Sequence, residues 1–266
     1  MESLIKRAAS DLAHSKYAIA LTGAGISTES GIADFRGPGG IWTRDPEAEK
    51  RAYQTYQTFL ENPKEYWISR LTQPSLIGNL ESAQPNPGHL ALAELEKIGI
   101  LKCVITQNID GLHERAGSQR LLEYHGSAFK LRCSACGTRF KREEYDLDRL
   151  LAEDRLPPRC RKCNGTIKSD VVHFHEPIPE DVAQQSMDEA WMCDAMLICG
   201  TSAVVYPFAQ LPRIARQHRE IQNTVIIEVN AEPTPLTEEG ISDYFIQGKT
   251  AETLPRILAE VKELLK

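Results

Sequence analysis

The chain has 266 residues and a formal net charge of −6, with 41% hydrophobic and 26% charged residues. This is the composition of an ordinary globular protein, long enough for one large domain or for a large and a small one. The acidic balance makes free nucleic acid a poor default partner.

Helices and strands alternate along most of the chain. Apolar residues at helical spacing and terminal proline or glycine signals predict helices over 3–14, 46–71 (with a break at ENP), 85–99 and 251–266. Short apolar runs predict buried strands at 17–21, 100–106, 194–200 and 224–230. This alternation is typical of an α/β fold, with a mostly parallel sheet and helices on both of its faces.

The N-terminal segment shows no targeting signal. Residues 1–20 carry charges throughout and lack the apolar core of a signal peptide. No stretch reaches the length needed to cross a bilayer. The chain has seven cysteines, an odd number, so a disulfide framework is not expected. We therefore expect a cytoplasmic protein without a membrane partner.

Residues 128–172 interrupt the alternation and read as a small inserted module. They contain CSAC and CRKC, separated by 23 residues. Two such knuckles can close on one tetrahedral Zn²⁺ through four thiolates, those of Cys133, Cys136, Cys160 and Cys163. Because four protein ligands leave no open position, the predicted zinc is structural, one ion per chain. The alternative is four unrelated cysteines or a redox pair.

Small and polar residues follow each predicted strand. Gly23 and Gly25 follow the first, but Thr28 stands where a dinucleotide fingerprint has its third glycine, so a plain tight turn is an equal interpretation. The other three strands run into TQNID, GTS and NAEPT. Ligands of open α/β sheets bind outside the carboxyl ends of the strands. Four such ends predict a shared crevice for a polar ligand of dinucleotide size.

In order, GAGIS, GIADFRG, TQNIDGLH, HGS, the two C-x-x-C pairs, GTS and VNAEPT resemble the motifs of the sirtuins, the NAD-dependent protein-lysine deacylases. The resemblance covers about residues 15 to 255. It implies a Rossmann-like NAD-binding domain of residues 1–127 and 173–266, with a cofactor loop and helical segment at 36–85, and a zinc-binding module at 128–172. NAD and an acyl-lysine peptide would enter a cleft between them, and nicotinamide, O-acyl-ADP-ribose and free lysine would leave.

The resemblance also implies roles for single residues. His125 would be the general base, and Asn108 would hold the ribose and an ordered water. The implied cofactor-binding residues are Gly23, Ala24, Gly25, Ser27, Asp34, Phe35, Arg36, Gln107, Asn108, Ile109, Asp110, Gly200, Thr201, Ser202, Asn230, Ala231, Glu232 and Thr250. The peptide would pair with an extended segment formed by Val172, His173, Phe174 and His175.

The residue types suit this chemistry. Breaking the nicotinamide–ribose bond develops positive charge at the anomeric carbon, which an acyl oxygen held in line can trap. A histidine that titrates near neutrality suits the later activation of a ribose hydroxyl. No step needs a metal, in agreement with a closed four-cysteine site.

Each residue also has a plainer interpretation when taken alone. Asp110 can cap the helix GLHERA, Asn108 can serve a turn, His125 can fill a surface niche and Arg36 can be a solvated charge. Their occurrence in one ordered set favours the functional interpretation. We interpret His113 as structural, hydrogen-bonding near the end of that helix.

The chain departs from the family pattern in three places. Ala33 replaces a proline in GIPDFR, which leaves the loop more flexible. In VVHFHE, residues 171–176, His175 replaces a glycine and either narrows the acyl tunnel or points to solvent, and His173 would share its side of a strand. Arg70 follows Trp67 rather than a tyrosine three residues earlier. An acetyl or longer uncharged acyl group is therefore expected rather than an acidic one.

Three other functions compete with deacylation. Mono-ADP-ribosyl transfer or NAD hydrolysis is possible on the same scaffold, but neither needs His125 in the same role. A non-catalytic NAD-sensing module is disfavoured by the complete catalytic set. A Rossmann dehydrogenase is disfavoured by the broken glycine pattern.

Overall fold

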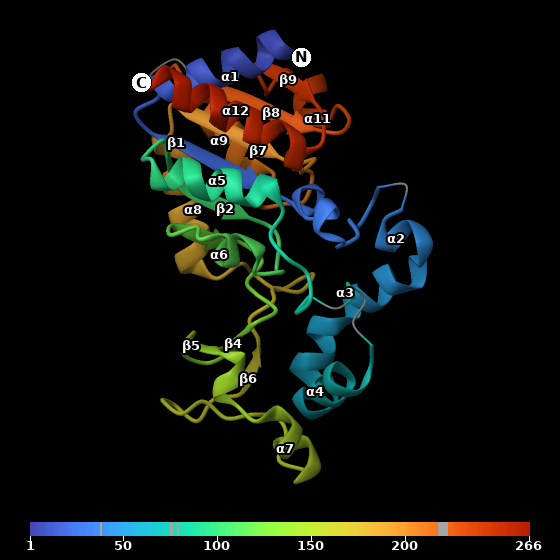
Figure 1. The fold of residues 1–266 in the computed structure, drawn as a ribbon. Coiled ribbons are helices and arrows are strands. Elements are labelled where there is room, and N and C mark those ends of the chain that lie inside the picture. Colours follow the sequence, from blue (N-terminus) through green and yellow to red (C-terminus); the bar gives the residue numbers. More distant parts are fainter. Residues whose placement is uncertain (38, 75–76, 79, 218–222) are drawn as a thin grey trace.

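A parallel sheet of six strands forms the centre of the larger part of the molecule (Figure 1). The computed structural model describes residues 1–37, 39–74, 77–78, 80–217 and 223–266. In spatial order the strands are β3 (Leu121–Glu123), β2 (Leu101–Thr106), β1 (Ala18–Thr22), β7 (Ala195–Cys199), β8 (Val225–Asn230) and β9 (Tyr244–Gln247). The order reverses between β1 and β7, and ligands of such sheets bind at this switch point.

Helices cover both faces of this sheet, which is why its central strands are continuous apolar runs. One face carries α1 (Glu2–His14), α5 (Pro87–Lys97) and α12 (Thr250–Leu264). The other carries α8 (Glu180–Met192) and α9 (Gln210–Gln217). Shorter helices at the edges are α6 (Leu112–Ala116), α11 (Pro235–Glu238), η1 (Ala24–Ile26) and η2 (Thr28–Ser30). The predicted fold class is confirmed.

Local chemistry explains where these helices begin and end. Asn86 accepts a hydrogen bond from the main-chain nitrogen of Gly88 and caps α5, whose first residue is Pro87. Gly99 follows the helix with φ +83°, a conformation that glycine adopts without strain. The main-chain path into β2 is therefore set by residues 86–99.

A second sheet of three antiparallel strands lies at the far end of the molecule from α1 and α12 (Figure 1). It contains β5 (Arg139–Lys141), β4 (Lys130–Cys133) and β6 (Ile167–Ser169), with η3 (Arg142–Glu144) and α7 (Leu147–Ala152) between β5 and β6. Beside it lie α3 (Pro46–Glu61) and α4 (Pro63–Thr72), and the short helix α2 (Ile41–Arg44) lies at the start of α3. The predicted break at ENP is the junction where Asn62 caps α4.

Helices α3 and α4 share a hydrophobic core with the three-stranded sheet. Phe59, Tyr66 and Trp67 pack against Leu131 and Ile167. The indole nitrogen of Trp67 is fully buried and donates to the main-chain oxygen of Ile167 at 2.8 Å. We call α3, α4 and residues 128–172 together the small lobe. The boundaries of the inserted module, near residues 128 and 172, remain a prediction. The shared core shows that α3 and α4 pack with this module.

No helix in the described part of the chain is long and apolar enough to cross a membrane.

Candidate active site

Side-chain hydrogen bonds join the carboxyl ends of four strands. The amide nitrogen of Asn108, after β2, donates to the main-chain oxygen of Gly23 and to the hydroxyl of Ser27, both at 3.0 Å. Gln107 Nε2 donates to the hydroxyl of Thr201, after β7, at 2.7 Å. Asn230 Nδ2, at the end of β8, donates to the main-chain oxygen of Thr201 at 3.1 Å. The structure thus brings together the four strand ends that the sequence singled out.

The glycine turn after β1 packs directly against the turn after β7. A Cβ on Gly25 would lie 2.7 Å from the main-chain oxygen of Gly200, and one on Gly23 would lie 2.6 Å from Thr201 Cβ. Gly25 N also donates to Gly200 O at 2.8 Å. We expected glycine at these positions because a ligand would approach the main chain closely. The structure shows a second reason, since the turn after β7 occupies the space that a side chain at either position would need.

Both carboxylate oxygens of Asp110 accept hydrogen bonds within the chain. One carboxylate oxygen accepts from the main-chain nitrogen of Leu112 at 2.9 Å, as in a helix cap. The other accepts from the hydroxyl of Ser27 at 2.6 Å. Asp110 therefore links the turn after β2 to the turn after β1.

Two buried imidazoles lie behind these turns. His113 Nε2 is 2.9 Å from the hydroxyl of Thr22, and its ring centroid is 4.8 Å from that of His89. Burial lowers the pKa of His113 well below its usual value and that of His89 to about 4. Both rings are therefore neutral at pH 7. This agrees with a structural His113, whereas His89 was not singled out, since its position in PNPGHL looks like an ordinary first helical turn.

A buried carboxylate that the sequence analysis also missed supports the end of β8. Glu228 is fully buried and accepts hydrogen bonds from Asn230, Thr234, Thr237 and Ser242. Both amide hydrogens of Asn230 are therefore used, one by Glu228 and one by Thr201, and its remaining polar atom is the acceptor Oδ1.

His125 follows β3, and its tautomer is set by its neighbour. Nδ1 lies 3.1 Å from the main-chain oxygen of Gln107. A carbonyl oxygen only accepts, so Nδ1 carries the hydrogen and Nε2 keeps its lone pair. Burial lowers the pKa of His125 to about 4, against the small opposing effect of the Gln107 carbonyl. At neutral pH His125 is therefore an uncharged base, and burial corrects our expectation of a group that titrates near neutrality. In the described part of the chain, Nε2 has no hydrogen-bond partner.

The predicted cofactor loop packs on the helical segment. The Phe35 ring centroid lies 5.0 Å from that of Trp42, and Asp34 Oδ1 accepts from the main-chain nitrogen of Gly37 at 3.2 Å. Arg36 is half-exposed and 3.6 Å from Glu49, as its plain interpretation suggests. In the described part of the chain, no hydrogen bond joins these three side chains to the strand ends.

The predicted peptide-binding segment is a turn rather than a strand, which corrects our expectation for residues 173–176. Glu176 N donates to His173 O at 3.1 Å, and His175 adopts φ +67°. The two histidines do not share one side: His173 Nε2 lies 3.0 Å from the hydroxyl of Tyr66, whereas His175 is exposed. The left-handed residue breaks the alternation that a strand would have produced.

His175 and Phe174 contact the small lobe. The Phe174 ring stacks on that of Tyr53, from α3, with centroids 4.3 Å apart, and the His175 ring lies 5.4 Å from the same ring. We expected His175 either to narrow the acyl tunnel or to point to solvent. Its exposed position beside Tyr53 agrees with the second alternative. Phe174 also packs on the cluster of Trp42 that contains Phe35.

The remaining predicted residues have less direct support. Ser202, Ala231 and Glu232 are exposed. Ile109 O accepts from Ala128 N at 2.9 Å, and Ala24 opens η1. Thr250 Oγ1, at the start of α12, is buried and has no hydrogen-bond partner in the described part of the chain.

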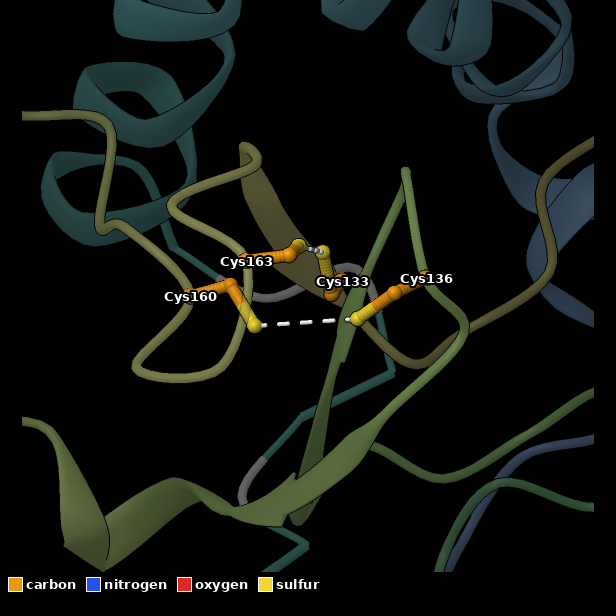
Figure 2. Close-up of side chains that lie close together, drawn as sticks. All are labelled: Cys133, Cys136, Cys160 and Cys163. Carbon is orange, nitrogen blue, oxygen red and sulfur yellow. Dashed lines mark hydrogen bonds between the residues drawn. The ribbon is translucent and has the colours of Figure 1, made fainter.

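The four cysteines of the small lobe converge on one point (Figure 2). Their sulfurs all lie within 4.8 Å of one another, with Cys133 and Cys163 3.5 Å apart and Cys136 and Cys160 3.8 Å apart. Sulfurs around a tetrahedral Zn²⁺ lie about 3.8 Å apart for bonds of about 2.3 Å. The predicted set of four ligands fits a structural zinc, and Gly137 and Asn164 adopt the positive φ of tight turns beside it.

Comparison with known proteins gives a consistent result. A model of the Sir2 family matches residues 23–207. NAD-dependent protein deacylase 2 of Pyrobaculum aerophilum is 44% identical over 96% of this chain and 95% of its own. The enzyme of the same name from Archaeoglobus fulgidus is 45% identical over 99% of this chain and 98% of its own.

Three similar structures contain ligands. A Sir2 homologue in complex with NAD is 39% identical with a TM-score of 0.77, over 100% of this chain and 95% of that one. A Sir2 protein with a myristoylated histone peptide is 39% identical with a TM-score of 0.68, over 100% and 99%. A Sir2 variant with a deacetylated p53 peptide and 3′-O-acetyl-ADP-ribose is 32% identical with a TM-score of 0.77, over 96% and 98%. From its motifs, fold and near full-length similarity, this chain belongs to the Sir2 family, the sirtuins.

Proposed function

We propose that this protein is an NAD-dependent protein-lysine deacylase that removes acetyl or longer uncharged acyl groups. The observation that carries the proposal is the neutral His125, which has no hydrogen bond to Nε2 in the described part of the chain and is joined through Gln107 to strand ends with amide and hydroxyl groups. The similar proteins of Pyrobaculum aerophilum and Archaeoglobus fulgidus both carry the name NAD-dependent protein deacylase 2, which supports the same activity.

The residues at the strand ends suit NAD as co-substrate. Asn230 Oδ1 would accept from a ribose hydroxyl, and Thr250 Oγ1 would find its missing partner in the adenosine half. The turn from Gly23 to Ser27 would lie along the diphosphate. When bound, NAD supplies a sugar carbon that becomes electrophilic as the nicotinamide bond breaks.

The chain's own residues then bind, orient and move protons. His125 Nε2 would accept the proton of a ribose hydroxyl, while Nδ1–H stays on the Gln107 carbonyl and holds the ring in one orientation. Asn108 is fixed by Gly23 and Ser27, so its amide oxygen is the group left to orient a hydroxyl or water. Phe35 and Phe174, which pack on the apolar cluster around Trp42, would exclude water from the nicotinamide side.

The proposed choice of acyl group rests on the surroundings of Arg70. Three residues before it, Trp67 is fully buried against the three-stranded sheet and has no hydroxyl, and the hydroxyl of Tyr66 is already 3.0 Å from His173 Nε2. Neither side chain is therefore placed to join the arginine in binding an acidic acyl group. The similar structures with a myristoylated peptide and with O-acetyl-ADP-ribose support uncharged acyl groups of different length.

Mass spectrometry on a panel of acyl-lysine peptides, with and without NAD, tests the proposal. The wild-type protein is expected to remove acyl mass only with NAD and to yield matching O-acyl-ADP-ribose. His125→Ala is expected to lose about 10²–10⁴-fold in rate while still binding NAD. His14→Ala, which changes an exposed histidine on α1, is the matched control and should behave as wild type.

A different product would identify a different function. NAD consumption without loss of acyl mass, or a peptide that gains ADP-ribose, would replace deacylation by glycohydrolysis or ADP-ribosyl transfer. An unchanged peptide and unchanged NAD would favour the non-catalytic NAD-sensing module.

We also propose that the protein works in the cytoplasm. All seven cysteines are free thiols, and the four clustered ones need to stay reduced to bind a metal. Fractionation of cells that express the tagged protein would test this, and recovery outside the cytosolic fraction would contradict it.

A further inference from the structure

A group of buried charges lies between the three-stranded sheet and the turn at 173–176. The side chain of Lys168 is 2% exposed, that of Glu176 is 7% exposed and that of Arg132 is 9% exposed. Asp170 lies beside them, with Oδ1 3.5 Å from Arg132 Nε. Burying charges is costly, and apolar residues of similar size often stabilise a fold at least as well. The presence of these charges therefore calls for a reason other than stability.

Lys168 uses all its hydrogen-bonding capacity within the chain. Its ammonium group donates to the main-chain oxygens of Ser169 and Val171, each at 2.7 Å, and lies 3.1 Å from Glu176 Oε2. An ammonium has three N–H bonds, so none is left for a ligand. Burial lowers the pKa of Lys168 to about 8, with the charge of Glu176 opposing the effect, so the group is still mainly charged at pH 7.

Glu176 closes the turn that contains the predicted peptide-binding residues. Its Oε2 accepts from the main-chain nitrogen of His173 at 3.0 Å, and its Oε1 accepts from Arg132 Nη2 at 2.7 Å. The turn is therefore attached to β4 through Arg132 and to β6 through Lys168.

One peptide unit connects Lys168 to the general base. The oxygen of the Val171–Val172 peptide accepts from Lys168, and the nitrogen of the same peptide donates to the main-chain oxygen of His125 at 2.8 Å. Because a peptide unit is planar and rigid, fixing one end fixes the other. A Cβ on Gly126 would collide with the main-chain oxygen of Asp170, so the two segments are in direct contact here.

The register of the small sheet places the two cations side by side. Arg132 pairs with Lys168, and Cys133 pairs with Ile167. A slip of one residue would turn Lys168 to the opposite face of the sheet. The cysteine cluster, which contains Cys133, thus secures a register on which the buried charges depend.

We propose that Lys168 is a positioning residue for deacylation, acting on His125 through the Val171–Val172 peptide and on the peptide-binding turn through Glu176. The inference rests on the proposed function. It also gives the closed metal site a role in the reaction, because the cluster holds the strand from which Lys168 reaches the active site.

Lys168→Met and the double variant Lys168→Met/Glu176→Gln test the inference. The single variant removes one of the two cations beside Glu176 and leaves an excess of buried negative charge. The double variant is neutral at both positions, so its melting temperature should be closer to that of the wild type. Neither restores the donor to the Val171 carbonyl. Lys262→Met, which breaks the 2.8 Å ion pair with Glu94 on the large domain, is the matched control.

Two readouts separate positioning from stability. The pKa of His125, measured by NMR with labelled histidine, is expected to rise by one unit or more in both Lys168 variants, because a loosened ring gains access to water. Their kcat/KM for the acyl-lysine peptide is expected to fall at least tenfold, while the Kd for NAD changes less than threefold. Zinc content and both readouts are expected to stay at wild-type values in Lys262→Met.

The inference is overturned if the Lys168 variants keep wild-type values for the His125 pKa and for peptide kcat/KM. It is also overturned if the double variant loses NAD binding and melting temperature as much as peptide turnover, which would show a purely structural role. If the wild-type protein deacylates no peptide, the proposed function fails. The pKa of His125 needs no substrate and would still decide whether Lys168 positions the ring.

Discussion

His125 Nδ1 lies 3.1 Å from the main-chain oxygen of Gln107, whose side chain in turn donates to Thr201. The proposed general base and the proposed NAD site are therefore connected through Gln107, which uses its main chain toward His125 and its side chain toward Thr201. Substitution of the Gln107 side chain leaves the contact with His125 in place.

The first prediction concerns pH. Burial lowers the pKa of His125 to about 4, and the imidazole can accept a proton only above its pKa. The value of kcat/KM for an acyl-lysine peptide is therefore expected to stay level as pH falls to about 5, and to decline below that. Gln107→Ala should weaken NAD binding without changing the pH at which kcat/KM declines. A decline centred between pH 6 and 7 would contradict the prediction, provided that circular dichroism shows a folded protein.

The second prediction concerns the metal. The four sulfurs lie within 4.8 Å of one another, and four thiolates brought together without a cation repel one another. Removal of zinc by a chelator is expected to lower the melting temperature and to loosen β4 and β6, with peptide turnover lost before NAD binding. Hydrogen exchange and zinc analysis would test this. Full melting temperature and activity after verified removal would disprove it.

The third prediction concerns the contact between the turns after β1 and β7. Gly25→Ala places a Cβ 2.7 Å from Gly200 O, and the main chain has no side-chain freedom to relieve the clash. We expect a loss of about 1–3 kcal/mol in stability and at least tenfold weaker NAD binding. Gly39→Ala, where a Cβ would have no atom of the described residues within 4 Å, is the control for melting temperature. Equal melting temperatures for the two variants would contradict this explanation.

The fourth prediction concerns His175, which adopts φ +67° and lies against Tyr53. The left-handed conformation costs a residue with a Cβ roughly 1–2 kcal/mol, and the ring contact returns about 0.5–1.5 kcal/mol. His175→Gly loses both and should stay within about 1 kcal/mol of wild type. His175→Ala keeps the strain without the contact and should be less stable than His175→Gly. Urea denaturation measures the order, and the reverse order would refute the argument.

The sequence predicted the features that depend on local pattern. β1, β2, β7 and β8 are apolar runs because both faces of the sheet are covered, and the C-x-x-C spacing reflects the geometry of one tetrahedral ion. β3 and β9 were missed because they have three and four residues and carry half-exposed positions. Strands this short have no pattern of their own and form because a neighbouring strand is already in place.

Features that depend on long-range packing were not predictable in this way. Glu228 sits inside an apolar run as a single acidic residue, and its four donors come from residues 230–242, brought to it by the fold. The link from Lys168 to His125 passes between two chain segments more than forty residues apart, and neither segment has a sequence signal for it.

The shared core of α3, α4 and the three-stranded sheet limits how the family's domains can be exchanged. Trp67 comes from one excursion of the chain out of the large sheet, and its partner Ile167 comes from another. A chimera that replaces residues 128–172 alone would pair a foreign sheet with a native indole, whereas a chimera that carries 46–72 as well would transplant a complete interface. Chimeras between sirtuins are therefore expected to fold when residues 46–72 and 128–172 are exchanged together, and to fail when only one of the two segments is exchanged.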